Sequence, residues 1–187
     1  MDHQSVFRMP TRMKITGRSS SITNAFVNSI IPVVDPSPEE IEKALDLLGM
    51  TPDTMECAYC GDRNTEWDHF RPLVADKKPT GYISEIRNLV PSCGKCNQSK
   101  GNKKWKAWIR GPAPLSPATR GVTDLAVRVQ RLQAYENWPS TSQIDFELVV
   151  DAETWESHWV NCEQIQDLMK VSQVLASKIS EQASRSL

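Results

Sequence analysis

The stretch that decides the fold begins with Cys57-Ala58-Tyr59-Cys60 and ends with Cys93-Gly94-Lys95-Cys96, with 32 residues between the two pairs. Each C-x-x-C pair places two sulfurs on one tight turn, and a structural Zn²⁺ takes four ligands at about 2.3 Å. Four unconnected core thiols are the alternative. The ligand spacing of both pairs favours a closed zinc site made by Cys57, Cys60, Cys93 and Cys96.

The composition agrees with this interpretation. With 187 residues and 39% hydrophobic residues, the chain has the size of one domain or one core with additions. Its 22 Lys+Arg balance 23 Asp+Glu, which excludes a protein that holds nucleic acid by bulk charge. The longest apolar run is far too short to cross a bilayer, and the N-terminus has no apolar signal region. We therefore expect a cytoplasmic protein without a membrane partner, in which paired cysteines bind metal.

Between and after the cysteine pairs lie three polar motifs. They are Glu66-Trp67-Asp68-His69-Phe70, Asn88-Leu89-Val90-Pro91-Ser92 and Asn97-Gln98-Ser99-Lys100. In this order, from about Cys57 to Lys100, the chain resembles the HNH nuclease family. The resemblance implies an α+β fold with a ββα-metal core on the zinc knuckles, and helical extensions on both sides.

The same resemblance implies a site around one phosphate. Asp68 and His69 would end a strand, and Asn97 would lie near the start of the next helix, where the family name has histidine. His69 is then the general base and Asn88 the residue that orients its loop. Asp68 and Asn97 are the ligands of a catalytic Mg²⁺ or Mn²⁺, ions that prefer hard oxygen ligands. Turn and helix-cap roles are the alternatives for Asp68 and Asn97.

Chemistry supports these roles independently of the family. An imidazole with an ordinary pKa of about 6.5 is mostly neutral at pH 7 and can accept a proton from water. Adjacent residues of a regular strand point to opposite faces, so Asp68 and His69 cannot both face one metal. A base on one side, with a ligand at a strand end or bulge, fits better.

A basic segment follows the second motif. From Cys93 to Arg110 the chain has no acidic residue, and we expect its cations to bind DNA phosphates in a salt-dependent way. A solvated helix face is the alternative. The cations are Lys95, Lys100, Lys103, Lys104, Lys106 and Arg110.

The pattern predicts four regions. Residues 1–20 form a mobile basic arm, 21–56 a helical N-terminal extension, 57–110 the nuclease core and 111–187 a mainly helical C-terminal region. In the extension, Ser37-Pro38-Glu39-Glu40 predicts a capping box, and Gly49 ends that helix. The C-terminal region begins with a proline-rich linker at 111–117. We expect a helix at 123–137, a strand or extended segment at 143–150 and a long helix capped by Asp151.

These features predict a metal-dependent HNH endonuclease that hydrolyses double-stranded DNA, with structural zinc and catalytic magnesium or manganese. The resemblance points to restriction or defence against foreign DNA as its setting. A non-catalytic zinc module that binds nucleic acid or a protein is the alternative, and RNA or branched or modified DNA stays open as substrate. A homodimer through the last helix and packing of that helix on its own domain are both open.

Overall fold

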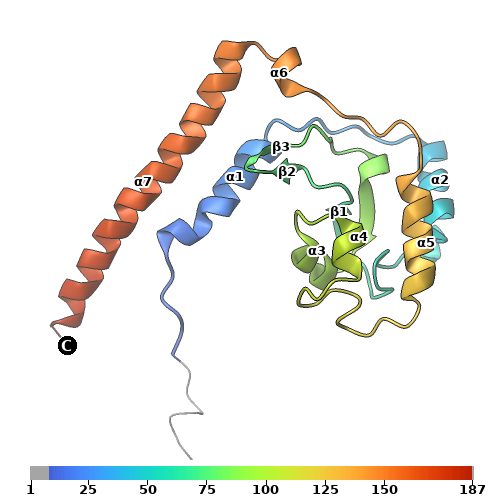
Figure 1. Cartoon of the computed structure of the whole chain (residues 1–187), viewed down its shortest axis with the longest axis horizontal. Coiled ribbons are helices and arrows are strands. Elements are labelled where there is room, and N and C mark those ends of the chain that lie inside the picture. Colours follow the sequence, from blue (N-terminus) through green and yellow to red (C-terminus); the bar gives the residue numbers. More distant parts are fainter. Residues whose placement is uncertain (1–8, 187) are drawn as a thin grey trace, which may run out of the picture. The chain divides into compact units, whose positions relative to one another are not determined.

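The computed structural model describes residues 9–186 and divides into two compact units (Figure 1). The larger unit is Val27–Val149 and contains all the predicted site residues. The smaller unit combines the chain before Val27 with the chain from Val150 onward. The predicted mixture of helix and sheet is confirmed. Among the described helices, none combines the length and the apolar character that a membrane crossing requires.

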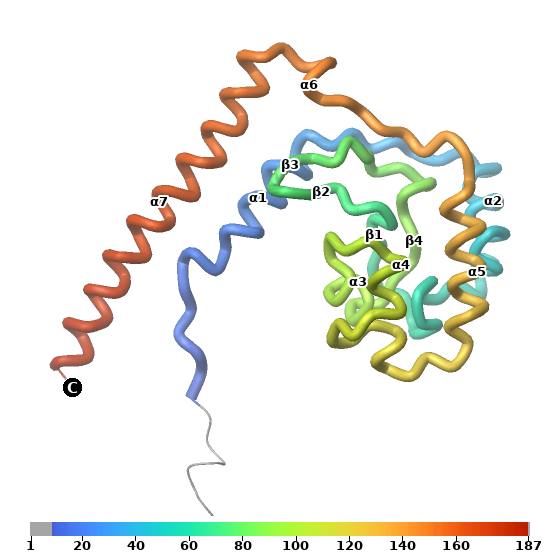
Figure 2. Tube along the Cα trace, in the orientation of Figure 1, coloured from blue at the N-terminus to red at the C-terminus, as the bar shows by residue number. Residues whose placement is uncertain are grey.

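The larger unit is built around two short antiparallel strands and the helix that follows them. Strand β1 (Glu66–His69) pairs with β4 (Leu89–Ser92), with Glu66 opposite Ser92 and His69 opposite Leu89. Helix α3 (Gly94–Lys100) begins directly after β4, as the trace in Figure 2 shows. The order β1, β4, α3 is consistent with the expected ββα core.

Short elements fill the connection between the two strands. Strands β2 (Val74–Ala75) and β3 (Lys78–Pro79) form a hairpin, and the 3-10 turn η4 (Ile86–Asn88) leads into β4. The residues of β1 alternate between its faces: Asp68 is buried, whereas Trp67 is 55% exposed. Because of this alternation, the side chain of Asp68 points to the opposite face of β1 from those of Trp67 and His69.

The flanking helices cover the core. Helix α2 (Pro38–Leu48) packs against α5 (Leu125–Glu136), and α4 (Trp105–Ile109) buries Trp105 and Trp108. The capping box of α2 is confirmed, because the Ser37 hydroxyl accepts from the Glu40 amide and the Glu40 carboxylate accepts from the Ser37 amide. The short turn η3 (Pro52–Thr54) then leads to the first cysteine pair. Helices α2, α4 and α5 thus contribute residues to the core around the two strands.

One expectation for the C-terminal region needs correction. The predicted strand or extended segment at 143–150 is wrong, because the chain there forms the short helix α6 (Phe146–Val149), with Asp145 accepting the Glu147 amide. The alternation of apolar residues was misleading: Phe146 is buried, but Leu148 is 82% exposed. The proline-rich segment has neither helix nor strand, as expected of a linker, and its residues Ser116 and Pro117 are fully buried.

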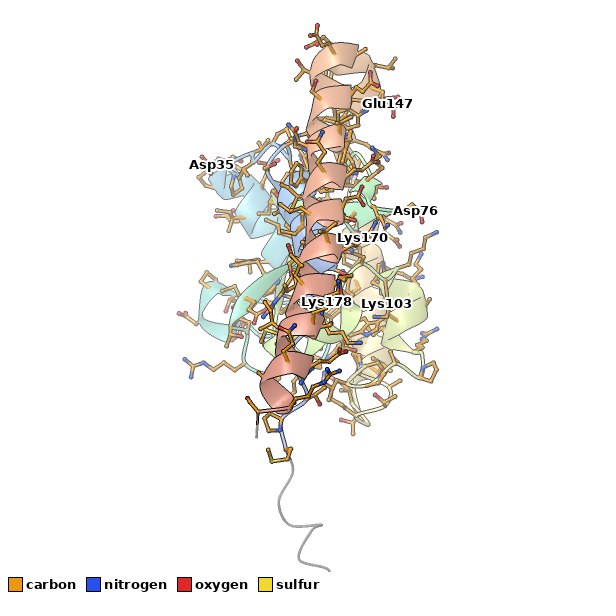
Figure 3. The ribbon with its side chains drawn as sticks, turned by 90° about the vertical axis from the view of Figure 1, so that its left-hand side faces the viewer. Asp35, Asp76, Lys103, Glu147, Lys170 and Lys178 are labelled. Carbon is orange, nitrogen blue, oxygen red and sulfur yellow. The ribbon has the colours of Figure 1, made fainter. Side chains whose placement is uncertain are left out.

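The described part of the smaller unit, from residue 9 to 26 and from 150 to 186, contains three helical elements. They are the 3-10 turn η2 (Ile15–Arg18), the helix α1 (Ser19–Asn28), whose last two residues belong to the larger unit, and the long helix α7 (Ala152–Ser184). The predicted cap of α7 is confirmed, because the Thr154 amide donates a hydrogen bond to the side chain of Asp151. Lys170 and Lys178 lie on α7 (Figure 3). Of the predicted basic arm, residues 1–8 lie outside the described part, and Ile15–Arg18 is helical.

Candidate functional site

The four paired cysteines form one cluster. Their sulfur atoms all lie within 4.8 Å of one another, and Cys57, Cys93 and Cys96 are buried. The first pair is a closed turn, because the Gly61 amide donates to the Cys57 carbonyl at 2.8 Å. The Ala58 amide donates to the Pro91 carbonyl at 2.9 Å and joins this turn to β4. The donor set fits a tetrahedral ion and could hold zinc.

Asp68 lies in a buried network beside this cluster. Its Oδ2 accepts a hydrogen bond from the Tyr59 hydroxyl at 2.5 Å and pairs with the Lys100 ammonium at 2.9 Å. Burial raises the pKa of Asp68 and Lys100 opposes this shift, whereas burial lowers the pKa of Lys100 and Asp68 opposes it. Each charge therefore depends on the other. Burial and the charge of Asp68 raise the pKa of Tyr59, which keeps its proton and donates it.

Lys100 does not lie on the expected DNA surface. Its side chain is 0% exposed, and its ammonium also donates to the carbonyl of His69 at 2.7 Å. A buried cation cannot reach a phosphate, so the DNA-binding role predicted for Lys100 is corrected to a structural one. The other predicted cations are exposed, among them Lys103 in the turn after α3 (Figure 3). They are Lys95, Lys103, Lys104, Lys106 and Arg110.

Replacing Lys100 by methionine is expected to destabilise the larger unit by about 3–5 kcal/mol, because the Asp68 carboxylate would stay buried without its cation. Chemical denaturation measures this loss. The double variant Lys100→Met/Asp68→Asn is expected to lose less than the sum of the two single changes, since it removes both charges. Strictly additive losses would contradict the coupling of this pair.

His69 lies on the opposite face of β1 from Asp68. Its Nε2 is 2.8 Å from the hydroxyl of Ser84, and the tautomer decides which atom donates. Burial, and then the positive charge of Lys100, lower the pKa of His69. A lowered pKa keeps the imidazole neutral near pH 7, the form that accepts a proton.

Asn88 holds the segment that follows His69. It is completely buried, and its Oδ1 accepts the Arg71 amide at 2.7 Å. Its Nδ2 donates to the carbonyls of Arg71 and Ile83, both at 3.2 Å. The backbone of Asn88 also accepts the Phe70 amide at 2.8 Å. These bonds fix the chain immediately after His69 to the start of β4.

Asn97 contacts Glu66, a residue that was not predicted to belong to the site. Its Nδ2 donates to the carboxylate of Glu66 at 2.5 Å, and Glu66 is exposed at the start of β1. Because Glu66 lies two residues before Asp68, the period of a strand places both on one face. That spacing was a signal for Glu66. No comparable signal marked Tyr59 or Ser84 as neighbours of the site.

Comparison with known proteins identifies the class of this centre. Residues 57–103 match the family model of the HNH endonuclease, so this segment is an HNH endonuclease domain. The chain is also similar to the CRISPR-associated endonuclease Cas9 of Corynebacterium diphtheriae, with 39% identity over 59 residues. That similarity covers 29% of this chain and only 5% of the relative's length. No solved structure matches the chain.

Proposed function

We propose that the protein is a metal-dependent nuclease that hydrolyses phosphodiester bonds in double-stranded DNA. The observation that carries this proposal is the buried Asn88, whose hydrogen bonds fix the segment after His69 within a domain of the HNH endonuclease family. A module that only binds DNA has no need for a histidine in a fixed position. The relative named above is an endonuclease, which also supports hydrolysis.

His69 is the general base in this proposal. Burial lowers the pKa of its imidazole, which favours the neutral form, and the contact of Nε2 with Ser84 supports a fixed ring orientation. A positioned base of this kind accelerates hydrolysis by about 10²–10⁴-fold. Asn88 is a positioning residue, because it acts through the backbone of the histidine segment.

Asp68 and Asn97 are the proposed ligands of the catalytic Mg²⁺ or Mn²⁺. Both contacts of Asp68 with its neighbours engage Oδ2, and Oδ1 is the oxygen proposed for the metal. A carboxylate accepts but cannot donate, so Glu66 must face the nitrogen of Asn97. The amide oxygen of Asn97 is thereby turned away from Glu66. When bound, the ion would stabilise the charge that develops on the phosphate and the leaving oxygen.

The exposed cations around α3 and α4 are the proposed DNA surface. Lys95 and Lys106 pair with Asp62 and Glu136 at 3.7 and 2.7 Å, and these exposed pairs are weak enough to exchange for phosphates. Such contacts give affinity that falls with salt and carries no sequence information. A setting in restriction or defence against foreign DNA belongs to the same proposal.

Cleavage of supercoiled plasmid tests this function. A chelator also removes the proposed structural zinc. All metal is therefore removed from the protein first, Zn²⁺ alone is restored, and Mg²⁺ or Mn²⁺ is then added. We expect nicking only after the second addition. The control is His69→Ala/Asn97→Ala, which keeps the buried pair of Asp68 and Lys100 and should bind DNA but not cut it. A zinc-loaded wild type that binds every substrate, including RNA and branched DNA, and cuts none would favour the binding module.

A further inference from the structure

We propose that Arg120 is an outer partner of the zinc site, which neutralises thiolate charge and fixes the sulfur of Cys96. This inference rests on the assignment of zinc to the four cysteines. The guanidinium Nη2 of Arg120 lies 2.9 Å from the Sγ of Cys96. Its Nε donates to the carbonyl of Leu115 at 3.1 Å. One side of the guanidinium is thus anchored to the loop while the other faces the sulfur.

The charge of the site explains why such a cation is needed. Four thiolates around one Zn²⁺ leave a net charge of about −2, and burying uncompensated charge is costly. Cys96 is 0% exposed, so water cannot solvate its sulfur. Lys95, inside the second cysteine pair, forms an ion pair with Asp62 rather than with the sulfurs. Arg120 brings a permanent positive charge and an N–H donor to this sulfur.

A second arginine provides a contrast. Arg128 of α5 donates to the carbonyl of Cys57 at 3.1 Å and pairs with Glu56 and Asp124 at 2.8 and 2.7 Å. Two carboxylates already compensate its charge, so Arg128 supports the backbone of the first cysteine turn. Within residues 9–186 no carboxylate pairs with Arg120. Its charge is therefore available to the sulfur cluster.

Hydrogen bonds within the loop that carries Arg120 fix the position of its backbone. The Arg120 amide donates to the Ser116 carbonyl at 3.1 Å, and the Ser116 hydroxyl donates to the Gly111 carbonyl at 2.8 Å. Ala118 is tied to the end of α4 through the carbonyl of Ile109 at 3.2 Å. This loop lies beyond the residues 57–103 that match the family. The functional zinc module accordingly extends to at least residue 120.

Zinc affinity of the full chain tests the proposal without any measure of cleavage. Arg120→Met, Arg120→Lys and wild type compete for Zn²⁺ with a chromophoric chelator, and Co²⁺ substitution reports the thiolate environment. We expect Arg120→Met to weaken zinc binding by about 10–100-fold, the usual effect of losing an outer partner. Arg120→Lys, which keeps the charge, should lose less. Arg63→Met is the matched control, since Arg63 is exposed beside the first cysteine pair.

The possible results distinguish the role of Arg120 from the assignment of zinc to the four cysteines. Zinc affinity of Arg120→Met equal to that of Arg63→Met, with wild type binding one Zn²⁺ per chain, would overturn the role of Arg120 alone. A wild type that binds no Zn²⁺ would overturn the zinc assignment and with it this inference. If Arg120→Met does not fold, Arg120→Lys decides: a shifted Co²⁺ spectrum and weaker zinc binding support the role, whereas wild-type values contradict it.

Discussion

Replacing His69 by alanine is expected to lower the rate of DNA cleavage by about 10²–10⁴-fold, because the proposed general base is lost. The fold should survive the change. The His69 side chain makes one described hydrogen bond, to Ser84, while its backbone carbonyl keeps its bond to Lys100. Single-turnover cleavage of a plasmid at saturating Mg²⁺ measures the rate, and thermal unfolding checks the fold.

Ser84→Ala is the control for this prediction. It removes the described partner of the imidazole but leaves the imidazole in place, so its effect should be much smaller than that of His69→Ala. DNA affinity should be unchanged in both variants. Cleavage by His69→Ala at the wild-type rate would contradict the assignment of the base and would point to another proton acceptor.

Loss of the zinc site is expected to unfold the larger unit. Structural zinc contributes an apparent free energy of about 10–16 kcal/mol in small zinc domains. The whole stability of a typical domain is about 5–15 kcal/mol. The buried cluster also ties the first cysteine turn to β4 and α3, so its removal leaves these short elements with little support. Cys96→Ala should therefore lose the cooperative unfolding transition of this unit.

Cys162→Ala is the matched control, because Cys162 is also buried but lies on α7, outside the cluster. It should retain the transition and its dependence on zinc. Circular dichroism with and without chelator measures both variants, and the zinc content of each is measured in parallel. Equal melting temperatures for Cys96→Ala and Cys162→Ala would show that the cluster does not support the fold.

The sequence predicted the elements whose signals are local. The capping box at Ser37 and the cap at Asp151 depend on hydrogen bonds within four residues, and both are confirmed. The clustering of the four cysteines is confirmed as well, because metal-ligand spacing is a local property of each pair. The predicted strand or extended segment at 143–150 was wrong over Phe146–Val149, because so short an alternation of apolar residues does not distinguish a strand from a helical turn.

The site was predictable in its parts but not in its contacts. Lys100 looked like one more surface cation of a basic segment, and only the tertiary structure brings its ammonium to Asp68. Arg120 is separated from Cys96 by 24 residues and follows a proline-rich stretch, so no sequence period connects the two. The proposed roles of Asp68, His69, Asn88 and Asn97 stay predictions until the variants are measured.

Tyr59 connects the four-cysteine cluster with the proposed catalytic site. It stands between Cys57 and Cys60 in the first cysteine turn, and its hydroxyl holds the carboxylate of Asp68. Oxidation of the thiols is expected to shift this turn and, with it, the carboxylate of Asp68. Under the proposed assignments of zinc and of the nuclease site, we expect oxidation of the thiols to reduce zinc binding and DNA cleavage together.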